Sequence, residues 1–237
     1  NVNTGKLTFS GVQLPEGTAT IASGATLEVT YGNTSAPLLQ SNSITVTGAG
    51  TFLKTGAGLY QAANQSAGRI TFDMTGGGLI DVQAGTLHSS SYGLQFAVTN
   101  KSSLNIESGA SFYSDGNAAS PVYIDALKGG GTIMLPFGAA TLYVGQNGGS
   151  GTWSGVIEVG GGGWSVVKNG AGTQIFASTS AYVGTTTINA GTLQIGAGST
   201  SGSLGTGAVT NNAALVFNRS DAVTVANAIS GSGSLTQ

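Results

Sequence analysis

Charged residues are scarce in this chain of 237 residues. Lysine and arginine number 7 and aspartate and glutamate 9, which is 7% of the sequence, whereas an ordinary soluble domain carries roughly 25%. Seven cations and a net charge of −2 do not make the basic surface that nucleic acid requires, so we expect no nucleic-acid partner. Coiled coils and helical bundles are excluded as well, because they need Glu, Lys, Arg and Leu in quantity.

Cysteine is absent, and histidine occurs once, as His88. These absences exclude a disulfide framework, a cysteine nucleophile and zinc sites made of thiolates or several histidines, so we expect no metal and no cofactor. No apolar run reaches the ~18 residues of a membrane-spanning helix, so we expect no membrane span in this segment. The start at Asn1 lacks the pattern of a signal peptide, and we interpret the chain as a mature or excised piece of a longer protein.

Glycine, with 41 residues, and a hydrophobic fraction of 40% distinguish the sequence from disordered chains. The hydrophobic residues stand in short runs that alternate with polar ones, such as Leu27-Glu28-Val29 and Ile44-Thr45-Val46. A period of two is typical of a strand with one buried face, and the Gly, Asn and Ser residues between the runs are typical of turns. The sequence therefore predicts an all-β protein with little or no helix.

Internal repetition is the strongest signal in the sequence. Hydrophobic residues that follow Gly-Thr or a similar pair recur at steps of 18 to 22 positions: Phe112, Ile133, Trp153, Ile175, Leu193, Leu215 and Leu235. About twenty residues hold three short strands and their turns, whereas a propeller blade needs ~40. The spacing predicts a single parallel β-helix, or β-solenoid, of about eleven coils over residues 1–237, with Trp153 pointing inward.

The repetition is uneven along the chain. We expect diverged coils with irregular loops in residues 1–149 and regular repeats in residues 150–237. The segments 89–96 and 115–121 fit the spacing least, and we expect plain connecting loops or slightly long coils there, with loops that leave the rod as the alternative. Such insertions are where solenoids often carry binding sites.

Residues 150–237 resemble the autotransporter-associated β-strand repeat of bacterial autotransporter passenger regions. The resemblance runs through Ser150-Gly151-Thr152-Trp153-Ser154-Gly155-Val156-Ile157, Val167-Lys168-Asn169-Gly170-Ala171-Gly172-Thr173 and Tyr182-Val183-Gly184-Thr185-Thr186-Thr187-Ile188-Asn189-Ala190-Gly191-Thr192-Leu193-Gln194-Ile195-Gly196, with a weaker copy at residues 48–59. It implies a right-handed parallel β-helix, displayed at the bacterial cell surface or secreted, that serves as a structural stalk or adhesin and not as an enzyme. Gln174-Ile175-Phe176 departs from the family's pattern and leaves the facing of that strand open.

Paired carboxylates would indicate an enzyme that acts on polysaccharides, a less favoured alternative. Glu107 and Asp125 are 18 positions apart and are candidates to stack on neighbouring coils, while Asp73 and Asp81 are candidates to share one coil. Neither pair has a cluster of Lys or Arg nearby. We therefore expect these four carboxylates to be solvated surface groups.

Other catalytic motifs are weak. His88 precedes three serines, but the sequence lacks a Gly-x-Ser-x-Gly elbow, so we expect an exposed loop histidine. Ser165 and Lys168 fit Ser-x-x-Lys, yet positions three apart on a strand point to opposite faces. Because Lys54 and Lys168 occupy matching repeat positions, we expect them to have a structural role, such as covering a corner.

Aromatic residues are the better binding candidates, because they anchor glycan and protein contacts. The preferred exposed cluster is Tyr92, Tyr113 and Tyr123, which lie beside the irregular segments. Its expected partner is a surface protein or glycan of a host or a bacterium. A second hypothesis is end-to-end self-association into extracellular filaments, because exposed coil ends present unpaired backbone groups.

Overall fold

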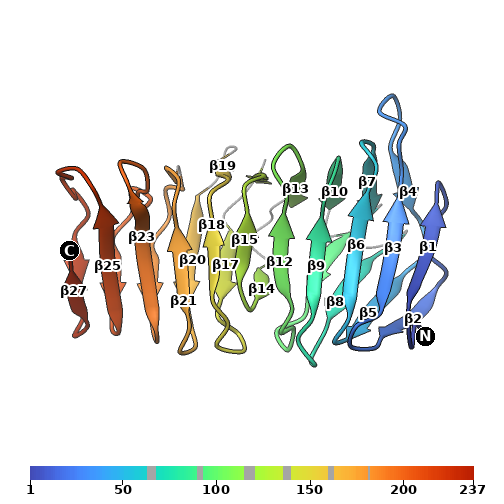
Figure 1. Cartoon of the computed structure of the whole chain (residues 1–237), viewed down its shortest axis with the longest axis horizontal. Helices are drawn as coiled ribbons and strands as arrows, with labels where there is room; N and C mark the ends of the chain where they lie inside the picture. Colours follow the sequence, from blue (N-terminus) through green and yellow to red (C-terminus); the bar gives the residue numbers. More distant parts are fainter. Residues whose placement is uncertain (63–67, 90–92, 115–120, 136–139, 160–162, 181) are drawn as a thin grey trace.

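The chain coils into an elongated parallel β-solenoid whose two termini lie at opposite ends of the long axis (Figure 1). This computed structural model describes residues 1–62, 68–89, 93–114, 121–135, 140–159, 163–180 and 182–237. Within these residues the regular elements are strands, and none is a helix. The predicted all-β solenoid is confirmed.

Three faces make up the solenoid. The first face is an eleven-stranded sheet of β1 (Lys6–Ser10), β3 (Thr26–Thr30), β6 (Thr51–Thr55), β9 (Leu79–Val82), β12 (Ser103–Ile106), β15 (Leu127–Gly129), β18 (Gly151–Trp153), β21 (Thr173–Phe176), β23 (Thr192–Ser199), β25 (Ala214–Arg219) and β27 (Ser234–Thr236). The second face is a six-stranded sheet of β4 (Leu38–Gln40), β7 (Leu59–Ala62), β10 (Thr86–Ser89), β13 (Ser111–Ser114), β16 (Thr132–Leu135) and β19 (Val156–Val159).

The third face consists of two sheets that meet where β11 contacts β14. Its strands are β2 (Gly17–Ile21), β5 (Ile44–Gly48), β8 (Ile70–Asp73) and β11 (Leu94–Phe96) in one sheet, and β14 (Val122–Ile124), β17 (Ala140–Val144), β20 (Trp164–Lys168), β22 (Thr186–Ile188), β24 (Val209–Asn211) and β26 (Ile229–Ser230) in the other. In the coils that begin with β3 to β18 the chain passes from the first face to the second and then to the third.

The number of coils is close to the prediction. Between β3 and β26 the chain makes about nine coils, and in the last three of them the described residues contribute no strand to the second face. The predicted eleven corresponds to the eleven strands of the first face, so the number of full turns is slightly smaller. The reason is the period, because successive inward positions of the first face, from Leu7, Leu27 and Phe52 onward, lie 19 to 28 residues apart.

Alternation along each strand separates the core from the surface. In β20 the residues Trp164, Val166 and Lys168 are buried, while Ser165 and Val167 between them are half-buried. Rings stack along the interior, with Phe52 against Phe72, Phe72 against Phe96 and Phe96 against Phe112, at centroid distances of 5.0 to 5.8 Å. Since each coil packs only on its neighbours, these columns form one continuous core.

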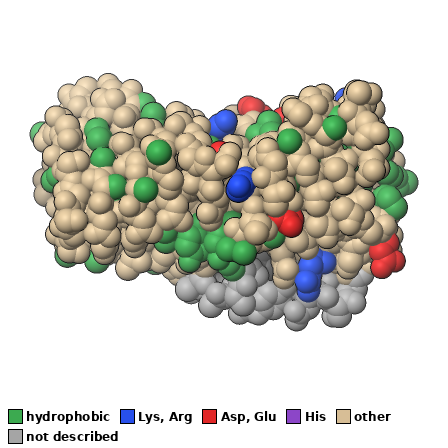
Figure 2. Space-filling model, turned by 90° about the horizontal axis from the view of Figure 1, so that it is seen from below, with side chains coloured by type: hydrophobic (Ala, Val, Ile, Leu, Met, Phe, Trp, Pro, Cys, Tyr) green, Lys and Arg blue, Asp and Glu red, His purple; other side chains and the backbone are tan. Residues whose placement is uncertain are grey.

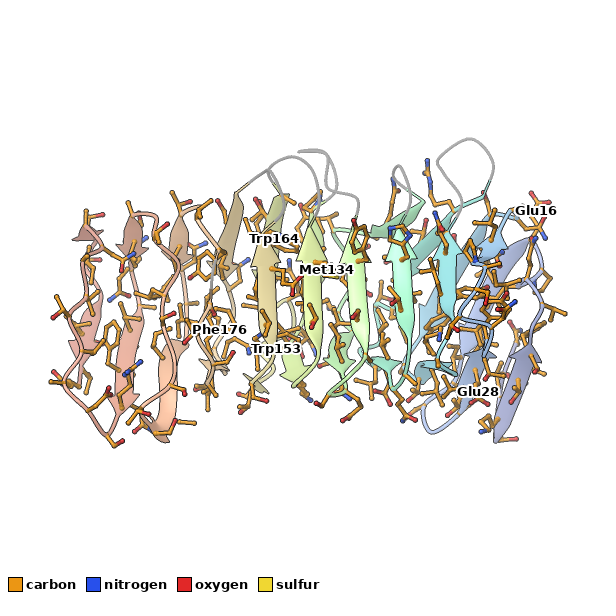
Figure 3. All side chains as sticks on the ribbon, turned by 90° about the horizontal axis from the view of Figure 1, so that it is seen from above. Glu16, Glu28, Met134, Trp153, Trp164 and Phe176 are labelled. Atoms are coloured by element: carbon orange, nitrogen blue, oxygen red, sulfur yellow. The ribbon has the colours of Figure 1, made fainter. Side chains whose placement is uncertain are left out.

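Trp153 is fully buried, which confirms its predicted inward position. It pairs in register with Phe176, and Figure 3 shows both in the middle part of the solenoid. The strand whose facing was open places Gln174 and Phe176 inside and Ile175 outside, half-buried. The regularly spaced hydrophobic residues do not all lie on one face. Phe112 and Ile133 belong to the second face, and Trp153 belongs to the first.

Candidate functional site

Two lysines with the same local sequence lie inside corners of the solenoid. Lys54 and Lys168 are fully buried at the ends of β6 and β20. The Nζ of Lys54 donates to the carbonyl oxygens of Thr55, Gly56 and Ala84 at 2.8, 2.7 and 3.0 Å. The Nζ of Lys168 donates in the same way to the carbonyl oxygens of Asn169, Gly170 and Ala190, at 2.6, 2.8 and 3.2 Å. Each ammonium thus joins the turn after its own strand to the turn of the next coil.

Buried amides also link neighbouring coils. Gln174 reaches the first face two strands away, where its Oε1 accepts from Leu127 N at 3.0 Å and its Nε2 donates to Leu127 O at 2.9 Å. Gln40 makes the same pair of bonds to Leu14, at 2.8 and 2.9 Å, and accepts from the Tyr60 hydroxyl at 2.7 Å. These side chains replace peptide groups in the ladder, so their role is structural.

The carboxylate pairs do not form a catalytic arrangement. Asp73 is on the third face and Asp81 on the first, while Glu107 follows a strand of the first face and Asp125 one of the third. Glu107 and Asp125 therefore do not stack at matching positions on neighbouring coils, whereas Asp73 and Asp81 lie on two consecutive strands, β8 and β9, of different faces. Asp125 Oδ1 instead accepts from the backbone N–H of Asn147 and Gly149 at 2.7 and 2.8 Å.

Asp81 corrects the expectation of a solvated surface carboxylate, because it is buried on β9 and its oxygens are taken up by neighbouring amides, chiefly Asn105. Asn105 Nδ2 donates to Asp81 Oδ1 and to Glu107 Oε1, both at 2.8 Å, and Gln83 Nε2 donates to Asp81 Oδ2 at 2.7 Å. Among the described residues no group of three or more His, Cys, Asp and Glu side chains is placed to hold a metal ion.

His88 corrects another expectation. It lies on strand β10, half-buried, and not on an exposed loop. Its ring contacts the Tyr113 ring edge-on at a centroid distance of 4.3 Å, because the two residues are in register on the second face. Ser165 and Lys168 point to opposite sides of β20, as the strand periodicity predicts.

The predicted tyrosine cluster is divided between two faces. Tyr113 is half-buried on the second face, whereas Tyr123 is half-buried on the third, and Tyr92 lies outside the described residues. The ring partner of Tyr123 is Tyr143, which the sequence analysis did not single out. Their rings stack at 4.6 Å with an interplanar angle of 19°, because the two residues are in register on β14 and β17. In the sequence, the spacing of 20 residues between Tyr123 and Tyr143, about one coil, is the signal that indicates this stacking.

Outward positions of the third face form one column along the solenoid. It begins with Thr18, Thr45, Thr71 and Gln95 on β2, β5, β8 and β11. It continues with Tyr123, Tyr143, Val167, Thr187, Thr210 and Ser230 on the strands from β14 to β26. Hydroxyl side chains therefore flank one short apolar stretch. Burial and the neighbouring Tyr143 raise the pKa of Tyr123.

On the same face, separated from this stretch by β11, is a polar hollow of about 360 Å³, lined by Ser43, Ile44, Thr45, Arg69 and Thr71. Arg69 is half-buried directly before β8, and its Nε has no hydrogen-bond partner among the described residues. The opposite edge of the third face carries Asp73, whose Oδ1 accepts from the Thr99 hydroxyl at 2.6 Å. Arg69 and Asp73 thus place charges of opposite sign at the two ends of β8.

Comparison with known proteins gives a family match in the C-terminal half of the solenoid and a similar curated protein. The model of the passenger-associated-transport-repeat family matches residues 166–195. The adhesin BmaC, an autotransporter of Brucella suis biovar 1 (strain 1330), is 40% identical over 90 residues. The chain carries autotransporter passenger repeats. The adhesin match covers 38% of this chain and 3% of BmaC, so the chain spans a small part of that relative's length. No solved structure matches.

The family match assigns the buried corner to the passenger repeat. Residues 166–195 run from β20 to β23 and include Lys168, its carbonyl partners and Gln174. Within this repeat, the buried polar side chains of Lys168 and Gln174 join neighbouring coils. No helix among the described residues is long and apolar enough to cross a membrane.

Proposed function

We propose that this chain is part of an autotransporter passenger that is exposed at a bacterial surface or secreted, where the solenoid acts as a stalk and adhesin. The observation that carries the proposal is a parallel β-solenoid containing passenger repeats and a segment 40% identical to an autotransporter adhesin. The role is structural and adhesive, not enzymatic.

The outer surface supports this role. Figure 2 shows few charged side chains on the face seen from below, and a cluster of hydrophobic side chains near the middle of the molecule's length. Stacked strands place equivalent side chains ~4.8 Å apart, so repeated charges of one sign would destabilise the rod. Threonine and serine tolerate such stacking, and they leave a flat surface on which a few aromatic and charged groups can define binding.

Surface display tests the proposal. Residues 1–237 are fused between a signal peptide and an autotransporter barrel in a non-adherent bacterium, with the same barrel without a passenger as the control. We expect antibody-accessible solenoid and a several-fold increase in attachment to host cells or to other bacteria. Solenoid that is accessible to antibody but leaves attachment at the control level would contradict the adhesive role.

A second candidate function is end-to-end assembly, which requires that β1 and β27 be the end strands of the assembling unit. Leu7 on β1 and Leu235 on β27 occupy inward positions, yet they are 45% and 60% exposed. A hollow of about 100 Å³ lies beside Leu7 and one of about 240 Å³ beside Phe217. Charged side chains are one of the usual protections of an exposed sheet edge against pairing with another chain. Residues 222–237 contain none.

A second copy of the chain fits these ends. Strand β1 of the second copy would pair with the free edge of β27 of the first copy. The column of inward side chains would then continue from Leu235 of one copy to Leu7 of the next. Val2, which bridges to Ile21 on the third face, would then lie at the level beyond β26. Both sheets would thus continue from one copy to the next.

Single-end variants test this assembly by sedimentation. We expect association that increases with concentration for the native chain, and monomers for Leu7→Lys and for Leu235→Lys. An equimolar mixture of the two variants keeps one intact end of each kind and should stop at dimers. A native chain that stays monomeric at every concentration would contradict the assembly.

A further inference from the structure

We infer that the third face carries a binding site for an anionic glycan, with Arg69 holding the acidic group and the Tyr123–Tyr143 pair contacting the sugar rings. The inference rests on the proposed adhesive function and specifies where and what the solenoid binds. It is carried by the juxtaposition of the polar hollow at Arg69 with the apolar stretch on the same column of outward positions.

Arg69 supplies the charged end of the site. Arg69 lines the hollow together with Ser43, Thr45 and Thr71, and its Nε is buried without a hydrogen-bond partner among the described residues. A guanidinium binds the planar oxygens of a carboxylate or the oxygens of a sulfate through parallel hydrogen bonds. Hydroxyl groups beside it suit a ligand that is itself rich in hydroxyls.

Charges around the hollow favour one orientation. Along the row of residues that precede the third-face strands, Glu16 lies two strands from Arg69, ~10 Å away. Asp73 lies at the far end of β8 and is held by Thr99. Because Arg69 lines the hollow and Glu16 does not, an acidic group is favoured in the hollow beside Arg69 and disfavoured beside Asp73.

The tyrosine pair supplies the apolar end. Thr71, Gln95, Tyr123 and Tyr143 are on four successive strands of the third face, which span ~15 Å along the axis. β14 and β17 lie in the middle part of the rod in Figure 1, the part of the length where Figure 2 shows the hydrophobic cluster. Aromatic side chains cover the apolar faces of sugars, and the amide of Gln95 between the two ends can bond to ring hydroxyls.

Other ligands of acidic character fit less well. Nucleic acids and anionic membranes are bound through several cations, since each contact contributes only part of the affinity. The hollow holds a single cation, Arg69, among its described lining residues. One guanidinium, several hydroxyls and two adjacent rings match a short oligosaccharide with one acidic group at the contact.

Binding of defined oligosaccharides to the purified chain tests the inference. The probes are a hyaluronan hexasaccharide for carboxylate, a carboxyl-reduced chondroitin sulfate hexasaccharide for sulfate, and a carboxyl-reduced hyaluronan hexasaccharide as the neutral control. We expect one acidic probe to bind at least ten times more tightly than the neutral one, and the stronger of the two identifies the acidic group. Equal binding of all three probes, or no binding, would overturn the site.

Variants locate the binding. Arg69→Gln should lower the affinity for the acidic probe at least tenfold, and Arg69→Lys should lower it less. Tyr143→Ala should lower the affinity severalfold. Lys128→Gln, on the outer side of the first face, is the matched control and should bind as the native chain does. Equal losses in Lys128→Gln would show that binding follows net charge and would contradict the site.

Surface display separates this inference from the proposed function. If displayed Arg69→Gln and Tyr143→Ala solenoids attach to cells as well as the native one, adhesion stands and the glycan site is wrong. If the purified chain binds the acidic probe but its display does not raise attachment, the site stands and the adhesive role is wrong.

Discussion

At the scale of single residues, the buried lysines account for much of how the corners are held. An ammonium excluded from water is stable only where acceptors surround it, and each of Lys54 and Lys168 has three carbonyl oxygens from two coils. Burial lowers the pKa of both, and the charge of Asp125 opposes the shift at Lys168. The repeated Lys-x-Gly-Ala-Gly sequence is therefore a cross-coil clamp.

Removing the clamp should cost stability. Lys54→Met and Lys168→Met leave buried carbonyl groups without a donor, and we expect each to lower the free energy of unfolding by about 2 kcal/mol. Lys101→Met, at an exposed position, should change it by less than ~0.5 kcal/mol. Urea unfolding followed by circular dichroism measures the difference. Equal stabilities of the Lys54 and Lys101 variants would contradict the clamp.

The pH dependence of stability tests the same ammonium. Burial lowers the pKa of Lys54 to about 8, while an unfolded lysine titrates near ~10.4. Between these values the unfolded chain binds a proton that the folded chain has released. The free energy of unfolding should therefore rise from about pH 8 to about pH 9.5, and the penalty of burial is present in full below pH 8. Lys54→Met should show a smaller rise, and identical profiles would contradict the lowered pKa.

At the scale of strands and turns, close stacking of coils makes certain glycines indispensable. Gly48, at the end of β5, has φ = 103°, and a Cβ there would overlap the carbonyl oxygen of Ile21 on the preceding coil. Gly77, between β8 and β9, has a similar φ of 91° but open space around it. The two positions separate the cost of backbone strain from the cost of a steric clash.

Alanine at these two glycines should therefore have unequal effects. We expect Gly77→Ala to cost about 1 kcal/mol, because only the left-handed conformation is penalised. Gly48→Ala should cost about 3 kcal/mol or more, because the coils must also move apart. Thermal and urea unfolding of both variants measure the costs. A Gly48→Ala variant as stable as Gly77→Ala would show that the corner yields without loss of packing.

The sequence predicts the elements better than it predicts their order around the coil. Alternation in runs such as Ile44-Thr45-Val46 is sufficient to identify strands, because burial follows it residue by residue. The spacing of hydrophobic residues does not identify the face, since coils of 19 to 28 residues allow Ile133 and Trp153 to look equivalent on different faces. Gln174 points inward because its amide bonds to Leu127, a contact 47 positions away that no local pattern contains.

The candidate site shows the same limit. Tyr123 was predicted from its type and its place near an irregular segment, and its stacking with Tyr143 is implied by their spacing of one coil. Arg69 had no signal of its own, because a single arginine beside hydroxyl residues is ordinary in sequence. Only the register of β5, β8 and β11 places it beside the column of outward side chains.

At the scale of the whole molecule, the solenoid is a one-dimensional stack in which stability depends on neighbours. Coils in the middle are covered on both sides, so their inward residues are fully buried, as Trp153 is. The end strands β1 and β27 each pair on one side only. Their inward leucines, Leu7 and Leu235, remain partly exposed for that reason.

This gradient predicts where the molecule opens first. Amide hydrogen exchange should be slowest in the first-face strands from β6 to β21 and fastest in β26 and β27, because opening an end coil breaks one interface and opening a central coil breaks two.

Trp153→Ala should lower the free energy of unfolding by about 4 kcal/mol and accelerate exchange in the adjacent strands β15 and β21. Leu235→Ala should change it by less than ~0.5 kcal/mol and affect exchange only near the C-terminal end. Uniform exchange along the chain, or equal costs of the two substitutions, would mean that the solenoid unfolds as one cooperative unit and not coil by coil.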